Sequence, residues 1–238
     1  MQSEDSVTPQ GGAFGGVVRF AAPLRQQVVD QLRNRILDGR YAPGARMIER
    51  VLCEEMQVSR TVVREALRQL ESEHLIELVP NIGPIVRLLT RDEVRSLYEV
   101  RAALESLASE ECAARTTPRI VARLDDALQL IESRAADDID GLLRAKDVFS
   151  QVVIDGSGNA VIGDMLGSIH ARVSQLRAVT LRSPGRLQTT VAELRTIRDA
   201  IAAGDSQAAR EASRRHVETA AVIALATFGE APSGLTAS

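Results

Sequence analysis

The chain has 238 residues, of which 45% are hydrophobic, 26% charged and 3% aromatic, and its net charge is −3 at pH 7. This balance indicates a soluble globular protein of two domains and excludes a uniformly basic coat for nucleic acid, so any nucleic-acid contact must be local. The sequence has no apolar run that could cross a bilayer, no secretory leader pattern and no paired cysteine spacing. We therefore expect a cytoplasmic protein without a membrane partner.

The two ends of the chain lack a regular pattern of apolar residues. Residues 1–20 are rich in Gly, Ser and Gln, which predicts a flexible arm, and residues 229–238 predict a disordered tail. Between them the pattern changes near residue 90, which predicts one domain over residues 21–89 and a second over residues 90–228.

The first domain begins with an amphipathic pattern. Residues 24–38 place an apolar residue at every fourth position, which predicts a helix that ends at Gly39. The stretch "GRYAPGARM" predicts a turn, with a short strand at Met47 and Ile48. The next stretch, "ERVLCEEM", predicts a short helix.

A third helix and a hairpin complete this domain. Ser59 is placed to cap a helix that runs to about Glu73. Two β-prone runs, residues 75–79 and 85–88, flank the turn sequence at residues 80–83, which predicts a hairpin. This order of elements is typical of a winged helix-turn-helix domain.

The third predicted helix has two unlike faces. At 100° per residue its apolar residues occupy one half, whereas Arg60, Thr61, Arg64 and Arg68 centre on the other. The second helix of a helix-turn-helix pair enters the major groove, and its N-terminal residues reach base edges. Arginine can donate two hydrogen bonds to guanine, so this face is predicted to bind DNA. The alternative is a solvated face on which neighbouring glutamates pair with the arginines.

The second domain is predicted to be entirely helical. Thr90, followed three residues later by Glu93, is the signature of a capping box, so a long helix should begin there. Further helices are predicted at residues 118–134, 138–154, 159–182, 186–203 and 205–228. The expected fold class is mainly α, with an N-terminal winged helix-turn-helix domain and a C-terminal all-α helical bundle.

The first domain resembles the DNA-binding domain of the GntR family of bacterial transcription regulators, over "LRQQVVDQLRNRILDGRYAPGARMIERVLCEEMQVSRTVVREALRQLESEHLIELVPNIGPIV". The segments "GRYAPG", "VSRT" and "REALRQLE" stand at the family spacings. The second domain resembles the FCD effector domain of the FadR-type subfamily. The resemblance implies a homodimeric transcription regulator, expected to be a repressor, that binds a palindromic double-stranded DNA operator and a small-molecule effector.

The resemblance also implies which residues contact DNA. These residues are Arg50, Ser59, Arg60, Thr61, Arg64, Asn81 and Gly83. The predicted hairpin is the wing of the winged helix-turn-helix domain, and two departures from the family pattern concern its contact with DNA. His74 stands where glycine is usual, and Ile82 stands where an arginine is common. We therefore expect weaker contact between the wing and DNA.

Many relatives hold a divalent metal in the effector domain through one Asp and three His. The aligned positions here carry Lys146, Ser150, Leu194 and His216, and Asp147 points about 100° away from the first of them. One neutral imidazole cannot hold zinc, which needs three or four ligands. We therefore expect no metal and no other cofactor.

Lys146, the only lysine of the sequence, suggests a substitute for the metal, because its ammonium could meet a carboxylate effector. The predicted effector-binding residues are Arg101, Lys146, Ser150, Leu194 and His216. His170 and Arg172 are expected on a helix that flanks the same pocket, and the alternative for His170 is a hydrogen-bonded histidine of the surface or core. The alternatives are that Lys146 reaches solvent or pairs with an acid, and that Arg101 only pairs with Glu105, one turn later.

Enzyme motifs are missing from the sequence. "DGSGN" is not G-x-S-x-G, and there is no Walker loop, no G-x-G-x-x-G after a strand and no H-E-x-x-H. We therefore expect no enzyme. Two other functions stay open: a ligand-independent architectural DNA-binding protein, and an enzyme that uses the pocket of the helical domain.

Overall fold

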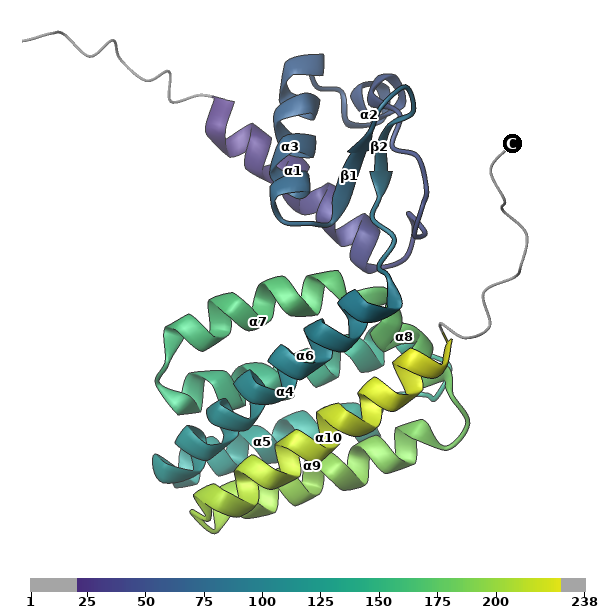
Figure 1. The fold of residues 1–238 in the computed structure, drawn as a ribbon. Helices are drawn as coiled ribbons and strands as arrows, with labels where there is room; N and C mark the ends of the chain where they lie inside the picture. The colour runs from purple at the N-terminus through teal and green to yellow at the C-terminus, as the bar shows by residue number, and fades with distance from the viewer. Residues whose placement is uncertain (1–20, 228–238) are drawn as a thin grey trace, which may run out of the picture.

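The computed structural model describes residues 21–227. The predicted arm, residues 1–20, and the predicted tail, residues 229–238, lie outside the described residues, as does the last residue of the final predicted helix. A small α/β part lies above a larger group of helices in Figure 1. Across residues 21–227, no helix is long and apolar enough to cross a membrane.

The small part consists of α1 (Ala21–Leu37), α2 (Glu49–Met56), α3 (Arg60–Ser72), β1 (Ile76–Val79) and β2 (Gly83–Val86). The two strands pair antiparallel, with Val79 opposite Gly83 and Ile76 opposite Val86, so the predicted hairpin is confirmed. The elements follow one another in the winged helix-turn-helix order.

The short strand predicted at Met47 and Ile48 is wrong. The chain makes a single bridge to the hairpin, between Arg46 and Ile85, and the amide of Met47 donates to the carbonyl of Pro84 at 2.8 Å. The ladder cannot extend further because Ile48 is already the N-cap of α2.

The core of the small part lies between α1, α2 and α3. Leu32, Met47, Leu52, Val63 and Leu70 are fully buried there. The predicted apolar face of α1 is buried except for its first member, since Leu24 lies near the start of the helix and is 42% exposed. The apolar half of α3 therefore anchors this helix to α1.

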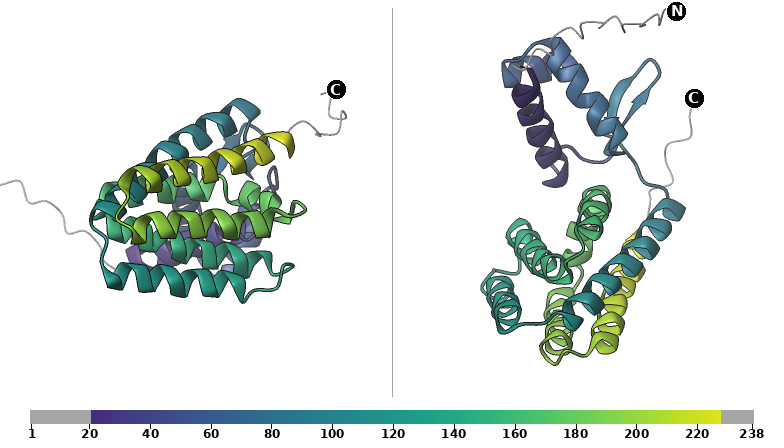
Figure 2. Two further views of the ribbon diagram at one scale, coloured as in Figure 1. Left: turned by 90° about the horizontal axis from the view of Figure 1, so that it is seen from below. Right: turned by 90° about the vertical axis from the view of Figure 1, so that its left-hand side faces the viewer.

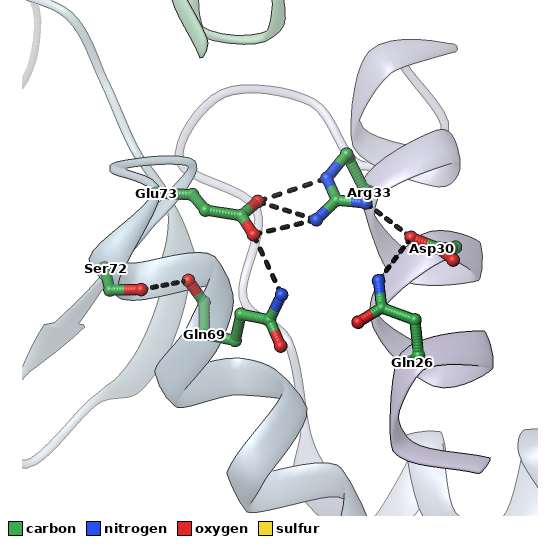
Figure 3. A network of polar contacts seen from close by, with 6 residues as sticks. All are labelled: Gln26, Asp30, Arg33, Gln69, Ser72 and Glu73. Carbon is green, nitrogen blue, oxygen red and sulfur yellow. Dashed lines mark hydrogen bonds and ion pairs between the residues drawn. The ribbon is translucent and has the colours of Figure 1, made fainter. Parts of the chain in front are cut away.

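A polar network also joins α1 to the end of α3 (Figure 3). Arg33 donates to both carboxylate oxygens of Glu73, at distances from 2.8 to 3.1 Å, and to Asp30 at 2.6 Å. Gln69 and Gln26 donate to the same two carboxylates at 3.2 and 3.0 Å. The network holds α3 at a fixed position on α1.

The helical group begins at α4 (Arg91–Ala114). Thr90 Oγ1 accepts from the amide of Glu93, and Glu93 Oε2 accepts from the amide of Thr90, so the predicted capping box is confirmed. The remaining helices are α5 (Pro118–Glu132), α6 (Ile139–Ser157), α7 (Ala160–Arg172), α8 (Ser174–Arg182), α9 (Arg186–Ala202) and α10 (Ser206–Thr227). Figures 1 and 2 show α4 and α10 packed side by side along their length.

The single helix predicted over residues 159–182 is wrong, since α7 and α8 are separate helices that meet at Val173. Val173 is fully buried, in a cluster with Val94, Tyr98 and Val217 from α4 and α10. The chain turns there to bury this side chain, and no glycine or proline marks the turn.

The end predicted for the preceding helix, near residue 154, is also early. Helix α6 continues through Gly156 to Ser157 and ends at Gly158, whose φ is 68°. Glycine adopts this left-handed conformation without steric cost, which makes Gly158 the effective stop.

Polar and apolar contacts link the two parts of the molecule within residues 21–227. Gln175 Nε2 at the start of α8 donates to the carbonyls of Ile36 and Tyr41, at 3.2 and 3.1 Å. Ala171 of α7 packs against the apolar core of the small part. Arg87, in the segment that connects β2 to α4, forms an ion pair with Glu93.

We expect His74→Gly to stabilise the protein. His74 is held at φ 59°, a left-handed conformation that costs a side-chain-bearing residue about 1 kcal/mol. Glycine at this position should raise the free energy of unfolding in urea by about 1 kcal/mol. The control is Gly39→Ala, because Gly39 has φ 72° and no atom lies within 4 Å of the position that a Cβ would take, and alanine there should be destabilising. Lower stability for His74→Gly would contradict the expectation.

We expect Gly156→Ala to destabilise the protein. A Cβ on Gly156 would lie 2.5 Å from Cys112 Sγ, and Cys112 is fully buried. The overlap should lower the free energy of unfolding by about 2 kcal/mol. Gly167→Ala is the matched helical control: no atom lies within 4 Å of its Cβ, so alanine should stabilise α7 by about 0.5 kcal/mol. Equal changes for the two variants would refute this close packing.

Candidate functional site

The corner between α2 and α3 sets the direction of the third helix. Gln57 ends α2 in a left-handed conformation with φ 53°. Ser59 is the N-cap of α3, and its Oγ accepts from the amide of Val62 at 3.4 Å, as the sequence predicts. The first turn of α3 therefore starts at the surface with Arg60 and Thr61 exposed.

The two faces predicted for α3 are present. Val63, Ala66, Leu67 and Leu70 are buried. The opposite face is exposed, and its members are Arg60, Thr61, Arg64 and Arg68. The arginines stay in water because the apolar half of the same helix is fixed against α1.

Some of these arginines form ion pairs at the surface. Arg64 Nε lies 2.9 Å from Glu49 Oε2, and Arg68 lies 2.7 Å from Glu65. The side chain of Arg64 remains 59% exposed, and such pairs contribute at most about 1 kcal/mol, so another anion can compete for the guanidinium. Arg60 has no carboxylate within ion-pair distance among residues 21–227.

The ion pair between Arg64 and Glu49 brings the start of α2 against α3. Arg50, the next residue on α2, is 68% exposed and pairs with Glu54 at 2.8 Å. Five of the predicted DNA-contacting residues thus lie on neighbouring turns of α2 and α3: Arg50, Ser59, Arg60, Thr61 and Arg64.

The wing is a separate projection, and the right-hand view of Figure 2 shows the hairpin extending away from the helices. Asn81 and Gly83 have φ values of 64° and 96°, which suit the tight turn. Ile82 is 46% exposed. The tip therefore presents an apolar side chain and no charge.

A cavity lies inside the helical group, between helices α4, α6, α7, α8, α9 and α10. The volume of the cavity is about 30 Å³, so the side chains that line it fill most of the space between the helices. The structure brings all the predicted effector-binding residues to this cavity: Arg101, Lys146, Ser150, Leu194 and His216. Arg172 is elsewhere, in a cleft between the two parts of the molecule.

Arg101 forms part of a buried cluster on the cavity wall. Its Nε lies 2.6 Å from Glu105 Oε1, which also lies 2.8 Å from His170 Nε2. Burial alone would raise the pKa of Glu105, but Arg101 and His170 outweigh this effect and hold the pKa well below its ordinary value. Arg101 therefore both pairs with Glu105 and lines the cavity, so the two interpretations of its role are compatible.

A second buried cluster joins α9 to α10. Arg186 is 3% exposed and its guanidinium lies 2.9 Å from Glu193, which in turn lies 2.6 Å from His216 Nδ1. Burial lowers the pKa of His216 to about 4 in spite of Glu193, so the ring is neutral at pH 7. A neutral ring that donates from Nδ1 leaves Nε2 as a hydrogen-bond acceptor.

Sequence reasoning missed several members of these clusters. Arg186 and Glu193 are seven residues apart, which places them on one face of α9, and this spacing was an available signal. Asp147 forms a 2.5 Å ion pair with Arg177 of α8, and no local pattern connects these two residues.

Lys146 lines the cavity without an acidic partner. Within the described part of the chain, no carboxylate lies within ion-pair distance of its ammonium, because the adjacent Asp147 is paired with Arg177. Burial, together with the charges of Arg177 and Arg101, lowers the pKa of Lys146 to about 7. Of the two alternatives for Lys146, the pair with a neighbouring acid is therefore not formed, whereas the half-buried side chain is partly exposed to solvent.

The metal that many relatives bind does not fit these residues. Lys146 and Leu194 stand at two of the four positions that align with the metal ligands of relatives, and both line the cavity. The ammonium of Lys146 repels a divalent ion, and the isobutyl group of Leu194 has no atom that could bind one. Among residues 21–227 no group of three or more His, Cys, Asp or Glu side chains could hold a metal ion.

Comparison with known proteins agrees with this two-part arrangement. Residues 24–86 match the family of bacterial regulatory proteins named gntR, and residues 96–219 match the FCD domain. An uncharacterized HTH-type transcriptional regulator from an unstable DNA locus of Streptomyces ambofaciens is 30% identical over 193 residues, which are 81% of each chain. The gluconate operon transcriptional repressor of Bacillus licheniformis is 33% identical over 106 residues, or 44% of this chain and 43% of that protein.

Solved structures show the same fold. McbR/YncC of Escherichia coli has a TM-score of 0.75 at 22% identity, over 86% of this chain and 98% of that one. A putative GntR regulator from Rhodococcus has a TM-score of 0.75 at 27% identity, over 87% and 99% of the two chains. The chain therefore belongs to the GntR family of bacterial transcription regulators and has the FadR-type arrangement, in which a helix-turn-helix domain precedes an FCD domain.

Proposed function

We propose that this protein is a cytoplasmic repressor that binds a palindromic operator as a homodimer and is controlled by a small carboxylate effector. The observation that carries the proposal is the exposed arginine face of α3, in the same chain as a cavity with an unpaired cation. We assign DNA binding to residues 21–89, and effector binding and dimerisation to residues 90–228.

Base recognition is assigned to the first turns of α3. Arg60 has no competing carboxylate in the described residues, and Arg64 has only an exposed pair with Glu49. Each arginine can bind guanine O6 and N7 through two hydrogen bonds, which discriminate against other bases by about 1 to 3 kcal/mol. The amides at the start of α3, beside Ser59, suit a backbone phosphate.

A homodimer is supported by the limited reach of one recognition helix. One helix reads only a few base pairs, whereas two helices related by a twofold axis read a palindrome. The helical part also exposes large apolar side chains that a second copy could cover. These side chains are Val100 and Leu107 on α4 and Val161 and Met165 on α7.

Effector control is supported by the position of α7 and α8. Arg177 of α8 lines the cavity, and Gln175, two residues earlier, holds the carbonyls of Ile36 and Tyr41 in the DNA-binding part. An effector that changes the position of α8 changes DNA affinity, and DNA must change effector affinity by the same factor. A ligand-independent architectural protein would show neither effect and little sequence preference. An enzyme would need turnover at the same cavity.

We expect Arg60→Ala/Arg64→Ala to abolish specific DNA binding. The operator is first selected from a randomised DNA library with the wild-type protein, and affinity is then measured by fluorescence anisotropy at fixed salt. Loss of two bidentate contacts should weaken binding at least about 100-fold, while binding to unrelated DNA should fall much less.

The control for this experiment is Arg119→Ala/Arg195→Ala, which removes two exposed arginines from α5 and α9. This variant should bind the operator within about twofold of the wild type, since charges beyond the screening length contribute little. Unchanged operator affinity in the α3 variant, with a native circular dichroism spectrum, would overturn the proposed function.

A further inference from the structure

The arginines around the cavity are each neutralised by a carboxylate. Arg101 of α4 pairs with Glu105 at 2.6 Å, and Arg177 of α8 pairs with Asp147 of α6 at 2.5 Å. The third pair, within α9, is the one between Arg186 and Glu193. These three pairs contribute no net charge to the cavity.

The two histidines beside these pairs add no charge either. His170 of α7 lies against Glu105, and His216 of α10 lies against Glu193. Burial lowers the pKa of each imidazole below its ordinary value, so both rings are neutral at pH 7. Each neutral ring donates one hydrogen bond to its carboxylate.

Lys146 is therefore the one charge on the cavity wall without a partner among the described residues. The groups that act on it are Arg101 and Glu105 from α4, Arg177 from α8, Arg186 from α9, and His216 from α10. The side chain of Lys146 is half-buried. When protonated, it gives the cavity a net charge of one positive unit, and a partly desolvated charge of this kind is stabilised by a counter-ion.

The rest of the lining is apolar or carries hydroxyl groups. Phe149, Leu166 and Ile197 provide apolar walls, and Ser109, Ser150 and Ser213 provide hydroxyl groups. Serine can both donate and accept, and His216 Nε2 can accept. The cavity thus suits a small molecule with an apolar body, one anionic group and few other polar atoms.

We propose that the cavity binds a small monocarboxylate as an ion pair with Lys146, and that Lys146 takes up a proton when this ligand binds. The inference rests on the proposed function and specifies the ligand class and the pH response of the same site. A dicarboxylate or a phosphate dianion would bring a second negative charge for which the wall has no free cation, and burying that charge is unfavourable.

The proton uptake follows from the change in surroundings of the ammonium. In the free protein the pKa of Lys146 is about 7, because of burial and the nearby guanidinium groups, so about half of the molecules carry the proton at neutral pH. A bound carboxylate places an opposite charge beside the ammonium and raises its pKa. Affinity should be nearly constant from about pH 5.5 to 7 and should then fall about tenfold for each pH unit until the pH reaches the raised pKa of Lys146 in the complex.

The test uses Lys146 as the only lysine of the chain. Protein labelled with [13Cε,15Nζ]lysine gives one side-chain NMR signal, which is titrated with pH in the full-length protein. The probes are butyrate and benzoate as monocarboxylates, succinate as a dicarboxylate, and inorganic phosphate. We expect a titration midpoint near pH 7 in the free protein, and a midpoint at least one pH unit higher with butyrate or benzoate.

Each other outcome contradicts the proposal. A free-protein midpoint near 10.5 would show an ordinary solvated lysine. A shift produced by succinate or phosphate, but by neither monocarboxylate, would assign the wrong ligand class. Unchanged midpoints with all four probes would exclude carboxylate binding at Lys146. None of these outcomes bears on DNA binding by α3, which the operator experiment tests separately.

Two substitutions at Lys146 test separately whether binding needs the positive charge and whether its pH dependence comes from the titration of this residue. Lys146→Met keeps a similar length without the charge and should lose monocarboxylate binding, measured by calorimetry. Lys146→Arg keeps a permanent charge, so any affinity it retains should no longer fall between pH 7 and 9. Arg144→Met is the matched control, because Arg144 is exposed on α6 and does not line the cavity, and its affinity should equal that of the wild type.

Discussion

A charge removed from water is stable only beside an opposite charge, and this constraint organises the interior of the FCD domain. Arg101 and Arg186, which are 4% and 3% exposed, each lie against a glutamate, and each glutamate also accepts from a histidine. These contacts join α4 to α7 and α9 to α10, so the walls of the cavity are held by the pairs that neutralise it. Lys146 is the exception, since its half-buried side chain has no carboxylate within ion-pair distance among residues 21–227.

In the DNA-binding domain the arginines of α3 are exposed, as contact with DNA would require. The apolar half of α3 is buried against α1, and the contact of Arg33 with Glu73 fixes the end of the same helix. Arg60 and Arg64 are thereby kept in water, where pairing is weak and reversible. One chain thus uses guanidinium groups as structural elements in the bundle and as exposed donors, unpaired or weakly paired, on α3.

Much of the fold follows from local sequence signals. The capping box at Thr90, the cap at Ser59 and the two faces of α3 depend on residues within one or two turns of one another, and the structure has all three. The break at Val173 was not predictable in this way, because its cause is burial against α4 and α10, which are distant in sequence. The family resemblance indicated the positions that line the cavity. The pairing of Arg177 with Asp147, which leaves Lys146 alone, depends on the approach of α8 to α6 and is visible only in three dimensions.

The contact made by Gln175 changes how the two domains can move. The covalent connection from β2 to α4 is one attachment, and the hydrogen bonds from Gln175 to Ile36 and Tyr41 are a second. The packing of Ala171 on the core of the small part is a third contact. Each contact beyond the covalent connection removes some freedom of rotation, so the orientation of the DNA-binding domain is restricted for as long as Gln175 and Ala171 keep these contacts.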